Sequence, residues 1–169
     1  MDLFVLNAAR VLLPALVVAT AAVFAGTASA AAKMPIGFYD DISFRWSTTR
    51  LQNLDQAVNA GASVIHTTAS WPAIAPTKPA DAANGDDPAY HLNDLDELVN
   101  NATVRGVRVM IDINGTPKWA NGGLSPNHLP KSMSTLQTFA KMLATRYNGR
   151  SGHGSVSLYS VWNEPNLGL

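Results

Sequence analysis

The residues with the clearest chemical potential lie near the end of the printed sequence, in Trp162-Asn163-Glu164-Pro165-Asn166. They follow an apolar stretch, 156–161, that is typical of a buried strand, so Glu164 would stand at the carboxyl end of that strand. A carboxyl group in this place can protonate a glycosidic oxygen. The amide of Asn163 can hydrogen-bond a sugar hydroxyl, and the indole of Trp162 can offer a sugar an apolar surface. The pentapeptide therefore points to acid catalysis on a carbohydrate.

A second carboxyl group is needed for this chemistry, because glycoside hydrolysis uses a pair of them on either side of the scissile bond. The printed sequence runs only five residues past Glu164. We therefore expect the second carboxylate in sequence beyond Leu169, unless an upstream acid fills the role.

The first thirty residues are expected to be a signal peptide and not part of the fold. Arg10 precedes a nearly continuous apolar run, 11–25, and Ala28-Ser29-Ala30 then supplies the small-x-small pattern of a cleavage site. The run is shorter than the roughly 20 residues that a membrane-spanning helix needs, which favours a cleaved signal over an uncleaved anchor. We expect a secreted protein with no membrane segment after cleavage, whose domain occupies residues 33–169.

Composition excludes several classes of function. Twelve basic and twelve acidic residues balance, and no Lys/Arg cluster could neutralise a row of phosphates, so nucleic acid is not an expected partner. The absence of Cys excludes a disulfide scaffold and thiolate metal sites, and no two of the four His stand at helical ligand spacing. A Gly-x-Ser-x-Gly elbow and a Gly-x-Gly-x-x-Gly loop are also absent, which weakens esterase and dinucleotide-binding hypotheses.

Strand and helix patterns alternate from residue 33 onward. Apolar segments predict strands at 35–39, 63–69, 107–113 and 156–162. Helices are expected between them, the first with Ser47 or Thr48 as its cap, the second from Asn93 and the third from Ser132 or Ser134. The first would direct Leu51, Leu54 and Val58 to the core, and a solvated loop is expected at 75–88.

This alternation predicts an α/β fold with a parallel sheet. The strand starts are 28, 43 and 49 residues apart. A (β/α)8 TIM barrel averages about 31 residues per unit, and its active-site loops lengthen some units. We expect such a barrel, of which this chain holds roughly the first four strands and three helices. A doubly wound open sheet gives the same alternation and stays open as the alternative.

The order of the motifs resembles a superfamily of retaining glycoside hydrolases, whose two catalytic carboxylates lie at the ends of barrel strands four and seven. Families 39 and 5 are the most similar. The resemblance covers the chain from about Pro35 to its end. Its matching pieces are Trp71-Pro72, Thr116-Pro117-Lys118-Trp119-Ala120, Ala144-Thr145-Arg146-Tyr147 and Trp162-Asn163-Glu164-Pro165-Asn166. It implies a glycosidase that cleaves O-glycosidic bonds of an oligo- or polysaccharide by double displacement.

The resemblance also implies roles for single residues. Glu164 would be the general acid/base, and Asn163 would hydrogen-bond the sugar 2-hydroxyl. Trp119 and Trp71 would be walls of sugar subsites. His66 stands on the second strand where members often carry Arg, so its charge would depend on pH where that of Arg does not. The nucleophile would come from strand seven, and no metal or other cofactor is implied.

The competing hypothesis is a non-catalytic fragment. Half a barrel leaves its first and fourth strands as open edges and should be poorly stable alone. Such a chain would at best bind carbohydrate weakly through Trp71 and Trp119, or pair with another half barrel, and its oligomeric state stays open. We expect the chain as printed not to turn over aryl glycosides.

Overall fold

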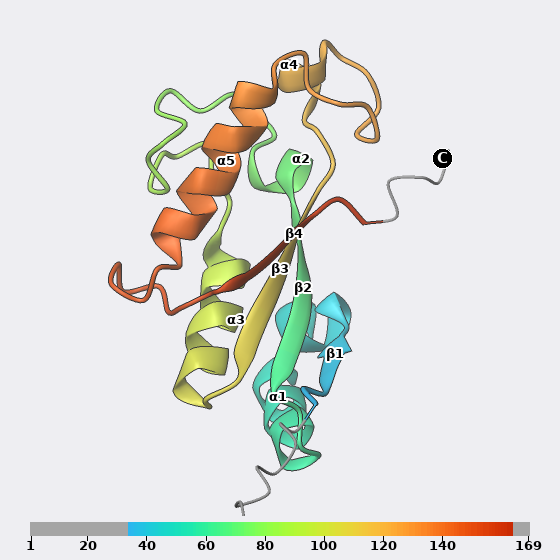
Figure 1. Ribbon diagram of the computed structural model, residues 1–169, viewed down its shortest axis with the longest axis vertical. Coiled ribbons are helices and arrows are strands. Elements are labelled where there is room, and N and C mark those ends of the chain that lie inside the picture. Colours follow the sequence, from blue (N-terminus) through green and yellow to red (C-terminus); the bar gives the residue numbers. More distant parts are fainter. Residues whose placement is uncertain (1–33, 164–169) are drawn as a thin grey trace, which may run out of the picture. The chain divides into compact units, whose positions relative to one another are not determined.

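The computed structural model describes residues 34–163, so the expected signal peptide, 1–30, and Glu164 lie outside the described residues. Figure 1 shows one sheet, and helices lie in the connections between its strands. All neighbouring strands are parallel and stand in sequence order. They are β1 (Gly37–Tyr39), β2 (Val64–Ser70), β3 (Arg108–Asn114) and β4 (Leu158–Val161). A doubly wound sheet reverses its strand order at a switch point, whereas this one does not, so the prediction of a partial (β/α)8 barrel is confirmed.

Three long helices occupy the crossovers where the sequence predicts them. They are α1 (Arg50–Asn59), α3 (Asn93–Val104) and α5 (Met133–Arg146). Three short helices were not predicted: a π-helix, η1 (Ile42–Trp46), then α2 (Trp71–Ile74) and α4 (Lys118–Asn121). Each follows the carboxyl end of a strand, so the short helices shape the end of the sheet where barrel enzymes carry their active sites.

The start of α1 differs from the sequence prediction. Ser47 closes a turn before the helix, because its hydroxyl accepts a hydrogen bond from the Thr49 amide (3.0 Å), and the helix begins only at Arg50. The expectation that Leu51 faces the core is wrong, since this side chain is 43% exposed. The helix buries Leu54 and Ala57 instead.

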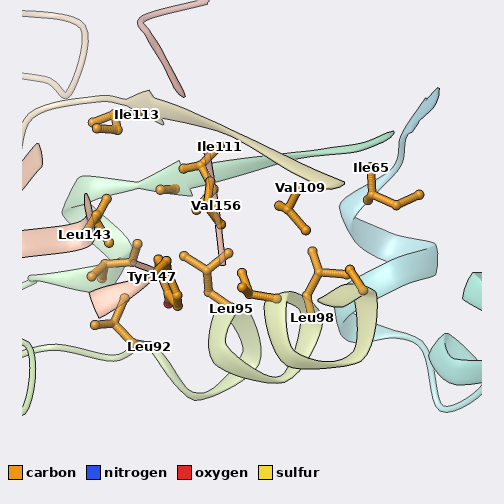
Figure 2. Packing of buried hydrophobic residues seen from close by; sticks show 14 of the residues in the cluster. Ile65, Leu92, Leu95, Leu98, Val109, Ile111, Ile113, Leu143, Tyr147 and Val156 are labelled. Carbon is orange, nitrogen blue, oxygen red and sulfur yellow. The ribbon is translucent and has the colours of Figure 1, made fainter. Parts of the chain in front are cut away.

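The core lies between one face of the sheet and the helices. Every second residue of β2 is buried, and most of β3 is buried too. Figure 2 shows Val109 and Ile111 of β3 facing Leu95 and Leu98 of α3, all of them at most 2% exposed. Tyr147, directly after α5, joins this layer and is fully buried. The helices therefore cover one face and leave His66, Thr68 and Asp112 on the other.

Gly154 fixes the entry of the chain into β4. It adopts a left-handed φ of +77°, and a Cβ there would stand 2.8 Å from the Thr103 hydroxyl oxygen and 2.9 Å from a methyl of Val99. Thr103 also accepts a hydrogen bond from the Ser155 amide (3.2 Å). We expect Gly154→Ala to lower the free energy of unfolding in urea by about 1 kcal/mol more than Gly152→Ala, because overpacking adds to the strain.

Gly152 is a matched control, since its φ of +85° carries the same left-handed penalty but a Cβ added there would meet no atom within 4 Å. Equal losses for the two variants would show that contact with α3 does not hold this turn.

Candidate functional site

A row of polar side chains lies on the sheet face opposite the helices, near the carboxyl ends of the strands. The register aligns Thr68 of β2 with Asp112 of β3 and Ser160 of β4. His66 stands two residues before Thr68 and therefore points to the same face. In a closed barrel this face becomes the interior, so the row forms the floor beneath a strand-end site.

His66 stacks on Tyr39, with ring centroids 4.5 Å apart and planes at 28°. The Tyr39 hydroxyl in turn pairs with the Thr68 hydroxyl at 2.8 Å. The Nε2 atom of His66 is buried and has no hydrogen-bond partner among residues 34–163. The structure therefore places His66 on the floor of the site, while its predicted contact with a substrate stays a prediction.

Asp112 is an Asp inside an apolar strand, which makes it a weak candidate for a site residue from the sequence alone. It is 2% exposed, and its Oδ1 accepts a hydrogen bond from the Ser160 hydroxyl at 2.7 Å, which ties β3 to β4. Its Oδ2 is buried without a partner in the described part of the chain. Buried carboxylate oxygens rarely stay unpaired. We therefore expect another polar group in the barrel interior to donate a hydrogen bond to the Oδ2 atom of Asp112.

The end of β4 brings Trp162, the first residue of the predicted catalytic motif, beside β3. The Trp162 amide donates to the Ile113 carbonyl at 2.8 Å, which extends the ladder one residue past the strand. Trp162 then takes a φ of +68°, a conformation that is uncommon outside Gly and that turns the chain sharply. Asn163 follows it and is exposed. Glu164 lies outside the described residues, so its predicted role stays a prediction.

The two predicted subsite tryptophans have different environments. Trp119 of α4 is half-buried and donates its indole N–H to the Ala75 carbonyl at 2.8 Å. Trp71 of α2 is 1% exposed, stacks on Phe139 at 5.2 Å and meets Trp119 edge-on at 5.7 Å. Trp71 therefore packs mainly against its aromatic neighbours, whereas Trp119 keeps part of its indole exposed. The subsite-wall roles of both residues stay predictions.

Arg45 of η1 is a positioning residue that sequence reasoning missed. It is 8% exposed and donates to the Thr68 carbonyl at 2.7 Å and to Asp94 at 2.8 Å. Asp41 accepts a hydrogen bond from the Thr68 amide at 3.1 Å and a short one from the Thr67 hydroxyl. Together these contacts fix the loop after β1 against the end of β2. No local pattern reveals them, because the partners lie far away in sequence.

Within residues 34–163, no three His, Asp or Glu side chains converge as ligands for a metal ion. Over the same range no helix has the length and apolarity needed to cross a bilayer. The groups that the described side chains could present to a ligand at the strand ends are therefore hydrogen-bonding groups, aromatic edges and one buried carboxylate.

Comparison with known proteins shows which protein family the sequence matches. The model of the family described as cellulase (glycosyl hydrolase family 5) matches residues 29–168, a range that includes the whole sheet and the motif after β4. No curated protein matches the chain.

Two solved structures are similar to the chain. A family 39 glycoside hydrolase from the gut symbiont Bacteroides cellulosilyticus WH2 superposes with a TM-score of 0.52 at 19% identity, over 77% of this chain and 24% of that one. The virulence factor SghA, solved with its substrate analogue salicin, gives a TM-score of 0.45 at 21% identity, over 72% of this chain and 24% of SghA. The chain thus spans about a quarter of the solved proteins it matches, and the first of them shares its fold. Since the family model covers most of the sequence, the chain belongs to glycoside hydrolase family 5, the cellulase family.

Proposed function

We propose that this chain is the N-terminal part of the catalytic barrel of a secreted glycoside hydrolase, which cleaves O-glycosidic bonds in an oligo- or polysaccharide by a retaining double displacement. The observation that carries the proposal is the family match, which runs to residue 168 and thus through Asn163 and Glu164. The sequential parallel strands support it, because Asn163 follows β4 at the end of the sheet where barrel enzymes act.

Glu164 has two tasks in this mechanism. It first gives its proton to the leaving glycosidic oxygen while a second carboxylate attacks the anomeric carbon and forms a glycosyl-enzyme. It then takes a proton from water, which attacks the same carbon and releases the sugar together with the second carboxylate. We place that nucleophile beyond Leu169.

Asn163 supports both steps by donating a hydrogen bond to the sugar 2-hydroxyl, a bond that strengthens as the oxocarbenium-like transition state forms. Its exposure after the left-handed Trp162 is consistent with this role, since the amide is accessible from solvent. Trp119 supplies an apolar edge that can face the CH groups of a sugar ring.

The experiment that tests the proposal is to read the coding sequence beyond the codon for Leu169 and to assay both lengths of the protein. We expect an open frame of ~120 residues or more that carries a second Glu at a strand end. The longer protein should hydrolyse aryl glycosides with retention of anomeric configuration, and the printed chain should not. A stop codon directly after Leu169 would contradict the proposal, as would full activity of the printed chain.

Export is a separate part of the proposal with its own prediction. Cleavage after Ala28-Ser29-Ala30 should give a secreted protein whose first residue is Ala31, as read by mass spectrometry of the culture medium. Ala30→Trp should block processing, because the peptidase accepts only small residues there. A wild-type product that still begins at Met1 would contradict cleavage.

A further inference from the structure

The sequence contains four Asn-Gly pairs, at 84–85, 114–115, 121–122 and 148–149. In such a pair the backbone nitrogen of Gly can attack the side-chain carbonyl carbon of Asn, because Gly has no Cβ to hinder the approach and turns easily into the required conformation. The reaction needs an accessible Asn side chain, a Gly amide that is not already hydrogen-bonded, and space for both to rotate. The four pairs differ in how far the structure meets these conditions.

The pair at 121–122 is locked by hydrogen bonds. Asn121 is only 2% exposed, and its Nδ2 donates to the carbonyls of Leu124 and Ser125, at 3.2 and 3.0 Å. The Gly122 amide donates to the Lys118 carbonyl at 3.1 Å. Neither the leaving group nor the attacking nitrogen can therefore move without breaking these bonds.

The pair at 114–115 is confined by packing. Asn114 is the last residue of β3 and lies opposite Ser70 of β2 in the sheet register. A Cβ added to Gly115 would stand 3.0 Å from the Cδ atom of Pro72 and 3.5 Å from the Cβ atom of Pro126. The backbone at this pair therefore lacks the space to rotate.

The pairs at 84–85 and 148–149 share an exposed and activated Asn. The Oδ1 atom of Asn84 accepts a hydrogen bond from the Asp86 amide at 3.0 Å. The Oδ1 atom of Asn148 accepts one from the Arg150 amide at 2.7 Å. A donor in this place stabilises the negative charge that forms on the oxygen when the carbonyl carbon is attacked. The side chains of the two pairs are thus equally prepared for the reaction.

The two pairs differ in the attacking nitrogen. The Gly149 amide donates to the Gly154 carbonyl at 2.9 Å, and a bridge between Asn148 and Ser155 closes the same turn. The Gly85 amide has no hydrogen-bond acceptor among residues 34–163. It lies in the loop after α2, which runs alongside α5 in Figure 1. Only the pair at 84–85 therefore combines an exposed Asn with an unbonded Gly amide.

We propose that Asn84 is a site of spontaneous deamidation. The Gly85 nitrogen gives up its proton and bonds to the Cγ atom of Asn84, the bond from Cγ to Nδ2 breaks, and ammonia leaves. Water then opens the cyclic imide at one of its two carbonyl groups, which yields aspartate or isoaspartate at position 84. This modification goes beyond the proposed function, since no step needs Glu164 or a substrate.

The modification would act on the contacts that hold the loop. Arg146 donates to the Gly85 carbonyl at 3.1 Å and to Asp86 at 2.8 Å. Isoaspartate adds one CH₂ group to the main chain directly before Gly85, which displaces this carbonyl from Arg146. We therefore expect residues 81–88 to exchange their amide hydrogens faster in the modified protein, since local opening controls this exchange.

The test incubates the natively produced protein in mildly alkaline buffer, which removes the proton of the attacking amide more readily. Peptide mapping by mass spectrometry then follows the conversion of each Asn to an acid. We expect Asn84 to react about fivefold or more faster than Asn148, the factor that corresponds to the net strength of one hydrogen bond. Asn114 and Asn121 should react more slowly still.

Denatured protein is the first control, because urea removes the hydrogen bonds and the packing that distinguish the pairs. All four should then react at similar rates. Asn84→Gln should stop the reaction at this position, because the longer side chain would have to close a six-membered ring. Asn148→Gln is the matched control and should leave the rate at Asn84 unchanged.

Three results would overturn the inference: no reaction at Asn84, a rate at Asn148 equal to that at Asn84 in the folded protein, or the same preference for Asn84 in urea. Glu164→Gln separates the two proposals, because it should not change the rate of deamidation. An inactive protein that deamidates at Asn84 would leave this inference standing and remove the proposed hydrolysis.

Discussion

Glu164→Gln is expected to lower kcat/KM of the barrel-completed protein for glycosides with poor leaving groups by about 10²–10⁴-fold, the usual contribution of a general acid. The amide of Gln has no proton to give to the leaving oxygen. A dinitrophenyl leaving group departs without protonation, so the first step should survive for such a substrate. The second step would then become limiting because water lacks its base. The measurement is a comparison of alkyl and dinitrophenyl glycosides, with a pre-steady-state burst expected for the latter.

Glu97→Gln is a suitable control for this experiment. Glu97 forms a partly exposed ion pair with Arg50, at 2.8 Å, between α3 and α1, away from the strand ends. Its loss should leave the kinetics unchanged. Azide should restore turnover of the dinitrophenyl glycoside by the Glu164→Gln variant, because this anion attacks the glycosyl-enzyme without a base. Native rates on the alkyl glycoside would show that Glu164 is not the acid.

The periodic elements of this fold were predictable because the information for them is local. Buried strands such as 107–113 are mostly apolar runs, and Gly61 and Gly106 mark the ends of helices by adopting positive φ. The short helices were missed for the opposite reason. The α4 turn is stabilised by the hydrogen bond from Trp119 to Ala75, a residue 44 positions away, and no window of local sequence contains both partners.

The kinds of residue in the candidate site were predictable from the sequence, but the exposure and the hydrogen-bond partners of each residue were only partly so. Aromatic side chains at strand ends are a recognisable pattern, but their exposure depends on what packs behind them. Trp71 and Trp119 look alike in sequence, yet Phe139 of a distant helix covers the first and leaves the second half-exposed. The unpaired oxygen of Asp112 has the same origin, since only the register of β3 against β4 gives its carboxyl one partner and not two.

The Ala144-Thr145-Arg146-Tyr147 motif has a structural explanation that the resemblance alone did not supply. Arg146 donates to both carboxylate oxygens of Asp96, at 2.8 and 2.7 Å, and the Tyr147 hydroxyl donates to Asp96 at 2.8 Å. Burial, followed by the negative charge of Asp96, raises the pKa of Tyr147 well above its usual range, so this donor stays protonated. The motif thus joins the end of α5 to α3.

Asp96→Asn should therefore destabilise the protein strongly. The side chains of Arg146 and Asp96 are only 10% and 14% exposed, so neutralising the carboxylate leaves a mostly buried guanidinium with only the exposed Asp86 as its counter-charge. Breaking such a buried pair costs about 3–5 kcal/mol, and urea unfolding should show a loss of this size.

Asp55→Asn provides the comparison, because Asp55 also pairs with an arginine, Arg105 at 2.6 Å, but is 55% exposed. An exposed pair contributes about 0–1 kcal/mol, so the two variants should differ by a wide margin. Equal losses of unfolding free energy in the two variants would mean that water reaches Asp96 and that its pair with Arg146 is no stronger than a surface ion pair.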